Sequence, residues 1–307
     1  MDYSQLVGEI FKKNSFLCVG LDTDFNKIPK CLQSLPKEKA LMTFNKSIID
    51  ATAPYAVAFK PNVAFYESEG LTGWKVLADS IAYIKQYYPE ILVIADAKRG
   101  DIGNTSERYA AAMFDNLQAD AVTVVPYMGK DSVAPFLAHK GKWTIILALT
   151  SNTGSEDFQF LPTFEEDVTA PQIKCQSKGR LTLTEAQSGG SLAPLYEQVL
   201  STASAWGSKD NTMFVIGATQ AEMLTDVRKI VLKNFLLVPG VGAQGGSLEA
   251  VAEFGMTAEC GLLVNSSRGI IYAGNDEYFA CVAAEKAKDL QQQMAKLLYK
   301  HTRLYVK

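Results

Sequence analysis

Three charged side chains lie close together in the stretch "VIADAKRGDIGNT" (93–105), directly after an apolar run. They are Asp96, Lys98 and Asp101. An ammonium group between two carboxylates can take part in acid–base or electrostatic catalysis. The same string of residues is also compatible with a solvated turn, so the other polar residues that follow apolar runs decide between the two interpretations.

Comparable residues end other apolar runs. Asp22 ends "GLD", Lys60 ends "AFK" and is followed by a proline, and Thr150 and Ser151 follow the run at 143–149. If these runs are parallel strands, their carboxyl ends meet at one edge, and the polar side chains gather there. Their joint appearance at matching strand ends favours a functional site.

Two late segments suggest an anion site. "PGVGAQGGS" (239–247) contains four glycines, and "NSSRGI" (265–270) contains Arg268. A glycine-rich loop lets backbone N–H groups approach an anion, and a guanidinium can bind it through two parallel hydrogen bonds. The loops after strands seven and eight are frequent phosphate sites in (β/α)₈ barrels.

The elements that would position these residues are eight apolar runs of strand length, most of them continuously apolar as in strands buried on both faces. Helix-compatible stretches separate them. Eight strand–helix repeats predict an α/β fold of the (β/α)₈ TIM-barrel type. A doubly wound open sheet also alternates in this way, but no G-x-G-x-x-G follows the first strand, which favours the barrel. The runs are 16–22, 55–60, 91–96, 120–125, 143–149, 212–217, 235–240 and 260–265.

One connection is longer than the others. Strand starts lie 23 to 39 residues apart, but 69 residues separate the starts at 143 and 212. The excess, residues 165–194, is polar and rich in Gly, Ser, Thr and Gln, which predicts a surface insertion and not a second domain. We therefore expect a single catalytic domain over 1–307, with an insertion between strands five and six.

Composition excludes several classes of protein. A net charge of −3 and a pI near 5.6 do not suggest a nucleic-acid partner, and no run approaches the ~18 apolar residues of a membrane span. The N-terminus lacks the features of a signal peptide, and the five scattered cysteines indicate a reducing compartment, so a cytoplasmic location is expected. The two histidines, His139 and His301, have no partner at ligand spacing, so neither a metal site nor a Ser-His triad is predicted.

These motifs together resemble the orotidine 5′-monophosphate decarboxylase family, and the longer-chain bacterial and protozoan branch fits best. The resemblance extends from "VGLDTD" through "FKPN", "DAKRGDIGNT", "LTSNTGS" and "PGVGAQGG" to "SSRGIIYA". It implies cofactor-free decarboxylation of orotidine 5′-monophosphate (OMP) to UMP in pyrimidine biosynthesis. The insertion at 165–194 is the main departure from the family pattern.

The resemblance also implies roles for the charged residues. Lys60, Asp96, Lys98 and Asp101 would form a catalytic array in which Lys98 protonates C6 of the pyrimidine. Asp96 would lie beside the substrate carboxylate, and Lys60 would neutralise and orient Asp96. Because the C6 carbanion lies in the ring plane and cannot delocalise into the π system, the site must stabilise it with groups fixed in advance.

The family's remaining residues bind substrate. Asp101, Ile102 and Thr105 would reach into the neighbouring subunit's site, which implies a homodimer. Asp22 would bind a ribose hydroxyl and Ser151 the pyrimidine edge, and Gln244 would link that edge to the phosphate. Arg268 would hold the phosphodianion with backbone N–H groups of the glycine loop. Pro239, Gly242 and Gln244 are the substrate-binding residues implied in that loop.

Three alternatives remain open. A related barrel with the same D-x-K-x-x-D string could decarboxylate or epimerise a sugar phosphate through an enediolate, usually with a divalent metal. A lyase could form a Schiff base on Lys60 or Lys98. A non-catalytic nucleotide-binding scaffold is the third. Lys60 before Pro61 and the Ser151 and Gln244 loops favour the pyrimidine substrate.

Overall fold

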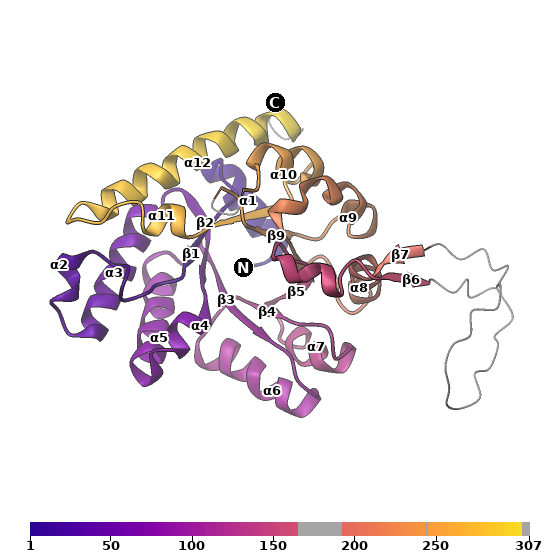
Figure 1. Ribbon diagram of the computed structural model, residues 1–307, viewed down its shortest axis with the longest axis horizontal. Helices are drawn as coiled ribbons and strands as arrows, with labels where there is room; N and C mark the ends of the chain where they lie inside the picture. Colours follow the sequence, from indigo (N-terminus) through magenta and orange to yellow (C-terminus); the bar gives the residue numbers. More distant parts are fainter. Residues whose placement is uncertain (165–191, 243–244, 303–307) are drawn as a thin grey trace, which may run out of the picture.

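The computed structural model describes residues 1–164, 192–242 and 245–302 and contains a closed barrel of parallel strands. Around the barrel the order is β1-β10-β9-β8-β5-β4-β3-β2, and β1 closes the ring by pairing with both β2 and β10. Helices surround the barrel (Figure 1). The predicted (β/α)₈ fold is therefore confirmed.

Continuous burial explains why the sequence forms these strands. Every residue of β1 and β2 is buried, with the barrel interior on one face and helices on the other. All eight predicted runs form barrel strands, with ends that differ by a few residues. The strands are β1 (Leu17–Leu21), β2 (Ala56–Pro61), β3 (Leu92–Arg99), β4 (Ala121–Val124), β5 (Trp143–Leu149), β8 (Thr212–Ile216), β9 (Leu236–Pro239) and β10 (Leu262–Ser266).

The longer helices bury one apolar face against the barrel, as α3 does with Leu41, Phe44 and Ile48. None of the helices in the described ranges is long and apolar enough to cross a membrane. The helices are α1 (Tyr3–Lys13), α2 (Lys30–Gln33), α3 (Lys37–Thr52), α4 (Val63–Glu67), α5 (Gly70–Tyr87), α6 (Gly103–Ala111), η1 (Ala112–Asn116), α7 (Lys130–Leu137), η2 (Thr153–Asp157), α8 (Leu195–Ser204), η3 (Ala218–Met223), α9 (Leu224–Ile230), α10 (Leu248–Gly255), α11 (Arg268–Ile271) and α12 (Phe279–His301).

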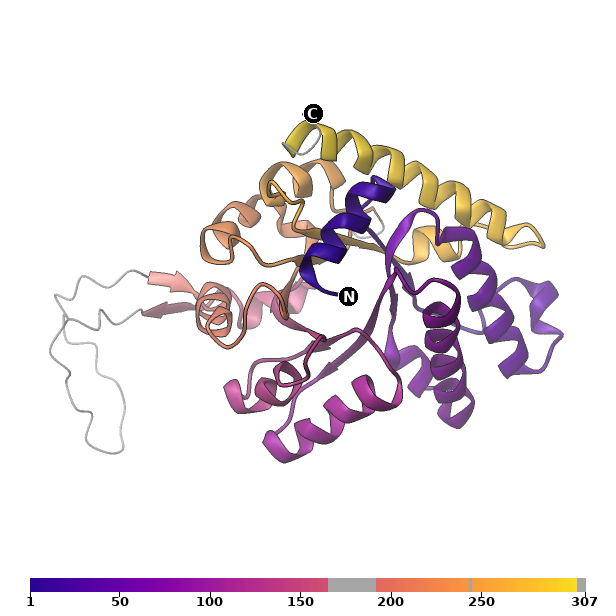
Figure 2. The same cartoon turned by 180° about the vertical axis from the view of Figure 1, so that it is seen from behind.

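Helix α1 covers the amino-terminal end of the barrel, as the reverse view shows (Figure 2). A capping box between Asp2 and Gln5 starts the helix. The ring of Tyr3 packs on Phe235, just before β9, and the indole N–H of Trp143 donates to the Met1 carbonyl at 2.9 Å. This end of the barrel is therefore closed, and the opposite end holds the βα loops.

The predicted insertion begins and ends beside a small hairpin. Strand β6 (Pro162–Phe164) pairs antiparallel with β7 (Leu192–Pro194), which projects from the barrel near α8 (Figure 1). Leu192–Pro194, the end of the predicted insertion, is thus part of a strand and not of a loop. Residues 165–191 lie outside the described ranges, so the prediction of an insertion within one domain stays a prediction there.

Arg228 binds four backbone carbonyls at the closed end of the barrel. Its guanidinium donates to Gly255, Asn234 and Gly261 at 2.7 Å and to Val231 at 3.1 Å. The side chain is buried, and this burial lowers the pKa of the guanidinium to about 10. One residue therefore ties the ends of α9 and α10 to the starts of β9 and β10.

Replacing Arg228 with methionine should lower the free energy of unfolding by at least about 3 kcal/mol, because several buried acceptors lose their donor at once. Arg228→Lys should recover little of the lost stability, because an ammonium group cannot reproduce the hydrogen bonds of the planar guanidinium. Urea denaturation with an unchanged slope would measure the loss. The neighbouring exposed Lys229→Met is the control and should change little, and a similar effect in both variants would contradict the prediction.

Candidate functional site

The centre of the site is Asp96, which binds two lysines at once. Lys60 on β2 places Nζ 2.8 Å from Asp96 Oδ2, and Lys98 on β3 places Nζ 2.6 Å from Asp96 Oδ1. Asp22, at the end of β1, contributes a second carboxylate 4.0 Å from Lys60 Nζ. The structure therefore brings together four of the predicted residues from three adjacent strands.

Burial strengthens the electrostatic interactions between the charged groups of this array. Lys60 is 4% and Asp96 8% exposed, whereas the Lys98 side chain is 49% exposed. Burial by itself would raise the pKa of Asp96, but the ammonium groups of Lys60 and Lys98 outweigh it and hold the pKa well below the usual range. Burial would likewise lower the pKa of Lys60, but Asp96 and Asp22 raise it above its usual value. The Lys60–Asp96 pair is thus ionised at neutral pH.

The backbone at Lys98 differs from the sequence-based expectation. β3 does not end at Asp96 but continues to Arg99, and its register with β4 shifts between Ala95 and Arg99. Lys98 adopts a φ of +47°, in the left-handed region that non-glycine residues rarely occupy. A bulge and not a regular strand therefore orients the Lys98 side chain.

A tyrosine and a buried polar network hold the loop that carries Asp22. Tyr272 donates its hydroxyl proton to the Asp22 carbonyl at 2.8 Å and accepts the Asp24 N–H at 2.7 Å. Beneath it, Tyr66 donates to the Leu21 carbonyl at 3.0 Å. Asp22 Oδ1 is buried and has no hydrogen-bond partner within the described part of the chain. It can therefore accept a hydroxyl proton from a ligand.

A cavity of about 180 Å³ lies over the array. Asp22, Lys60 and Asp96 line one part of it, and Pro239 and Arg268 line another. Arg268 is exposed at the first position of α11, where a cation can reach an anion at the mouth of the cavity. In the neighbouring loop, Gly240 and Gly242 have φ of +98° and +74°, so these positions favour glycine.

Lys98 and the other predicted residues that the structure describes do not line the cavity. Ser151 follows the end of β5 and lies against Gly217, and Gly242 is exposed in the loop after β9. Asp101 and Ile102 lie between β3 and α6, and Thr105 lies in the first turn of α6. The Asp101 carboxylate accepts the Ile102 N–H at 2.7 Å, and among the described residues it forms no ion pair with the array. Gln244 lies outside the described ranges.

Sequence reasoning missed three residues near the array. Asn62 and Asn265 line the cavity, and the hydroxyl of Thr123 on β4 donates to Asp96 Oδ1 at 2.9 Å. Asn62 follows Lys60 in "FKPN" and Asn265 ends the apolar run at 260–265, so their positions after strands could have pointed to them. Thr123 carries no such signal, because it lies inside the ordinary strand "AVTV".

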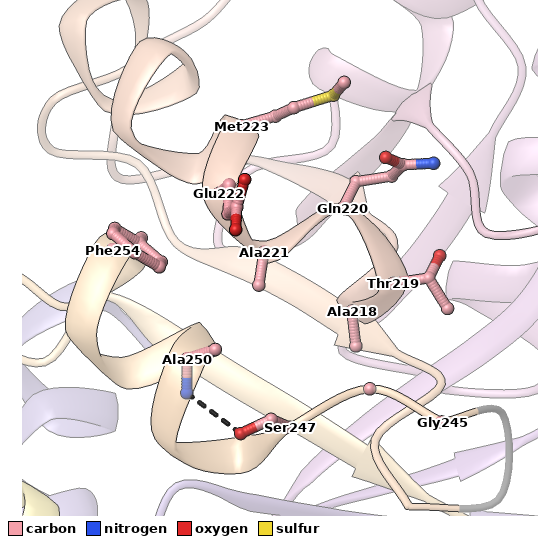
Figure 3. Close-up of a pocket in the computed structure, with 11 residues that line it drawn as sticks. Ala218, Thr219, Gln220, Ala221, Glu222, Met223, Gly245, Ser247, Ala250 and Phe254 are labelled. Atoms are coloured by element: carbon pink, nitrogen blue, oxygen red, sulfur yellow. Dashed lines mark hydrogen bonds between the residues drawn. The ribbon is translucent and has the colours of Figure 1, made fainter.

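A larger cavity, of about 300 Å³, lies beside the barrel between η3 and the start of α10 (Figure 3). Glu222, Met223 and Phe254 surround it, and Ser247 accepts the Ala250 N–H at 3.1 Å on its floor. Among the described residues that line it, Glu222 is the only charged one, so none of these residues is a cation that could bind an anionic substrate. The smaller cavity is the better candidate for an active site, because two carboxylates, a buried lysine and an arginine line it.

The arrangement suits a reaction that develops negative charge. Lys98 places a partly exposed ammonium at the edge of the array, where it can stabilise an anion and donate a proton. Lys60 and Asp96 are held by each other and by the strands, so little reorganisation is needed during reaction.

Comparisons with known proteins agree with this chemistry. The model of the orotidine 5'-phosphate decarboxylase / HUMPS family matches residues 15–280. An orotidine 5'-phosphate decarboxylase of Phocaeicola vulgatus is 52% identical over 298 residues, covering 97% of this chain and 99% of that protein. One from Christiangramia forsetii is 51% identical over 300 residues, covering 98% of this chain and 100% of that protein.

A solved structure is similar as well. That of Leishmania donovani OMP decarboxylase superposes with a TM-score of 0.75 at 32% identity and covers 97% of this chain and 99% of that one. These matches confirm the resemblance that the motifs predicted. The chain belongs to the orotidine 5'-phosphate decarboxylase / HUMPS family.

Proposed function

We propose that this chain decarboxylates orotidine 5′-monophosphate to UMP, with no metal or organic cofactor. The observation that carries the proposal is the array around the buried Asp96, in which Lys60 and Lys98 each bind one carboxylate oxygen, at 2.8 and 2.6 Å. The names of the bacterial and protozoan relatives support the same substrate.

In the proposed mechanism, loss of carbon dioxide leaves an electron pair on C6 in the plane of the ring. The Lys98 ammonium stabilises this charge as it develops and then transfers a proton to C6. Asp96 lies beside the departing carboxylate and keeps Lys98 in place. Lys60 stabilises Asp96, because a buried carboxylate without a partner would be costly.

Groups around the cavity would hold the rest of the substrate. Asp22, whose Oδ1 lacks a hydrogen-bond partner among the described residues, would accept a hydrogen bond from a ribose hydroxyl. Arg268 would bind the phosphodianion together with backbone N–H groups of the glycine loop that follows Pro239 and contains Gly242. Ser151 would bind the pyrimidine edge, and Gln244 would link that edge to the phosphate. Binding energy from the remote phosphate would help to assemble the site, which raises kcat as well as lowering KM.

The test is the loss of OMP absorbance on adding purified protein, with and without EDTA. Rapid conversion that EDTA does not affect is the expected result. No conversion of OMP, with metal-dependent turnover of a sugar phosphate, would contradict the proposal and assign the site to enediolate chemistry. Borohydride inactivation in the presence of substrate would instead indicate a Schiff base.

We further propose that the enzyme is a homodimer whose subunits share their sites. Ile102, Tyr127 and Met128 expose large apolar side chains on the loops after β3 and β4. These loops are adjacent, since the Val125 N–H donates to the Arg99 carbonyl at 2.8 Å. An exposed apolar cluster beside a site is typical of an interface. Asp101, Ile102 and Thr105 would reach from this cluster into the partner's cavity.

Mixing two inactive variants tests the shared site. Lys98→Ala and Asp101→Ala should each be nearly inactive alone. After subunit exchange, a mixed dimer regains one site with both native residues, so an equimolar mixture should recover about a quarter of wild-type activity. Lys98→Ala mixed with Lys60→Ala is the control and should recover nothing, because both residues belong to the same subunit's site. Absence of recovery in the first mixture, despite exchange, would contradict the cross-subunit role of Asp101.

We also propose a cytoplasmic location. Cys18 and Cys260 are buried free thiols, and Cys31 and Cys281 are exposed free thiols, as expected in a reducing compartment. Cys175 lies outside the described residues.

A further inference from the structure

The hydroxyl of Thr123 joins the two catalytic groups that β3 supplies. Thr123 lies on β4 and is 1% exposed. Its Oγ1 donates to Asp96 Oδ1 at 2.9 Å and accepts the backbone N–H of Lys98 at 2.9 Å. An amide can only donate, so the hydroxyl proton is directed to the carboxylate. One side chain therefore holds both Asp96 and the Lys98 backbone.

The position of Thr123 matches the irregularity of β3. Ala95 pairs with Val122 and Arg99 with Val124, so β3 advances four residues while β4 advances two. Thr123 is the β4 residue opposite this bulge, and Lys98, with its φ of +47°, lies within the bulge. Bulges beside active sites commonly re-aim a side chain.

Other contacts hold the far end of the bulge. The Arg99 carbonyl accepts the Val125 N–H at 2.8 Å, and the Arg99 guanidinium pairs with Glu67 and donates to the Ala97 carbonyl at 3.0 Å. These contacts fix the chain after Lys98 but do not touch the Lys98 N–H. Thr123 is the residue that satisfies this N–H and the Asp96 carboxylate together.

We propose that Thr123 is a positioning residue for decarboxylation: its hydroxyl keeps Lys98 in the left-handed conformation and fixes the orientation of the Asp96 carboxylate. Each oxygen of Asp96 then faces one lysine. This inference rests on the proposed function, since it assigns Thr123 to the array that performs the reaction. Thr123 touches no reacting atom and acts through Asp96 and Lys98.

Thr123→Val tests the proposal, because valine keeps the shape and removes the hydroxyl. We expect kcat to fall about ten- to a hundredfold, because small misplacements of catalytic groups cause losses of this size. KM should change less than about threefold. Thr123→Ser should restore most of kcat. The matched control is Thr144→Val on the neighbouring β5, because the buried Thr144 hydroxyl has no partner among the described residues. That variant should keep wild-type kcat.

An unchanged kcat in Thr123→Val, or an equal loss in the serine and valine variants, would overturn the proposal. Crystal structures of wild type and Thr123→Val give a readout that does not depend on the substrate. In the variant we expect Lys98 to leave the left-handed region or Asp96 Oδ1 to move away from Lys98 Nζ. An unchanged array would overturn the proposal even if wild type failed to convert OMP, whereas that failure alone would contradict only the proposed function.

Discussion

Replacing Lys98 with alanine should lower the turnover of OMP by at least about 10⁴-fold. Lys98 supplies two effects, electrostatic stabilisation of the developing charge and transfer of the proton, and each is typically worth ~10²-fold or more. The fold should survive, because the Lys98 side chain is half exposed and Asp96 keeps its contacts with Lys60 and Thr123.

Steady-state kinetics with OMP would measure this loss, and binding of UMP would show whether the site remains intact. We expect UMP affinity to change far less than kcat, since the phosphate and ribose contacts remain. Lys288→Ala, an exposed lysine on α12, is the control and should behave as wild type. If kcat fell less than about tenfold in Lys98→Ala, Lys98 would not be the general acid.

Replacing Asp96 with leucine should abolish activity and also destabilise the protein by about 3–5 kcal/mol, because it breaks a buried ion pair on one side only. Lys60 is 4% exposed, and its remaining carboxylate, Asp22, is 4.0 Å away. The ammonium would then be buried without a close partner. Chemical denaturation would measure the change in the free energy of unfolding.

The double variant Lys60→Met/Asp96→Leu separates stability from catalysis. Removing both charges should recover much of the lost stability, since apolar residues often replace a buried ion pair without a net cost. Activity should remain absent. If the double variant were as unstable as Asp96→Leu alone, the uncompensated Lys60 charge would not be the cause of the instability.

The pH dependence of stability provides a second check on the same pair. The folded-state pKa of Asp96 is lowered, so its contribution is present above the unfolded pKa of about 4 and is lost as the pH falls further. The folded-state pKa of Lys60 is raised, so its contribution is present below about pH 10 and is lost as the pH rises through the folded value. The wild-type free energy of unfolding should therefore fall at both acidic and alkaline pH. Both decreases should be smaller in the double variant.

The barrel and the edge of it that carries the polar residues could both be predicted from the amino-acid sequence. Strands buried on both faces need apolar residues throughout, so all eight runs were visible. A parallel barrel then requires that Asp22, Lys60 and Asp96, each at or near a strand end, meet at its carboxyl end. Their proximity followed from topology and did not require a known structure.

The contacts that hold the array could not be predicted in this way. The left-handed backbone of Lys98 and the role of Thr123 both depend on the register between β3 and β4. The hydrophobic pattern of the sequence does not specify this register. The role of Arg228 could not be predicted for a related reason. An arginine on a helix is normally expected to be solvated, and only the folded structure shows that the ends of other elements surround this one. Strand identity is a local property of hydrophobic pattern, whereas hydrogen bonds between distant segments depend on how those segments pack.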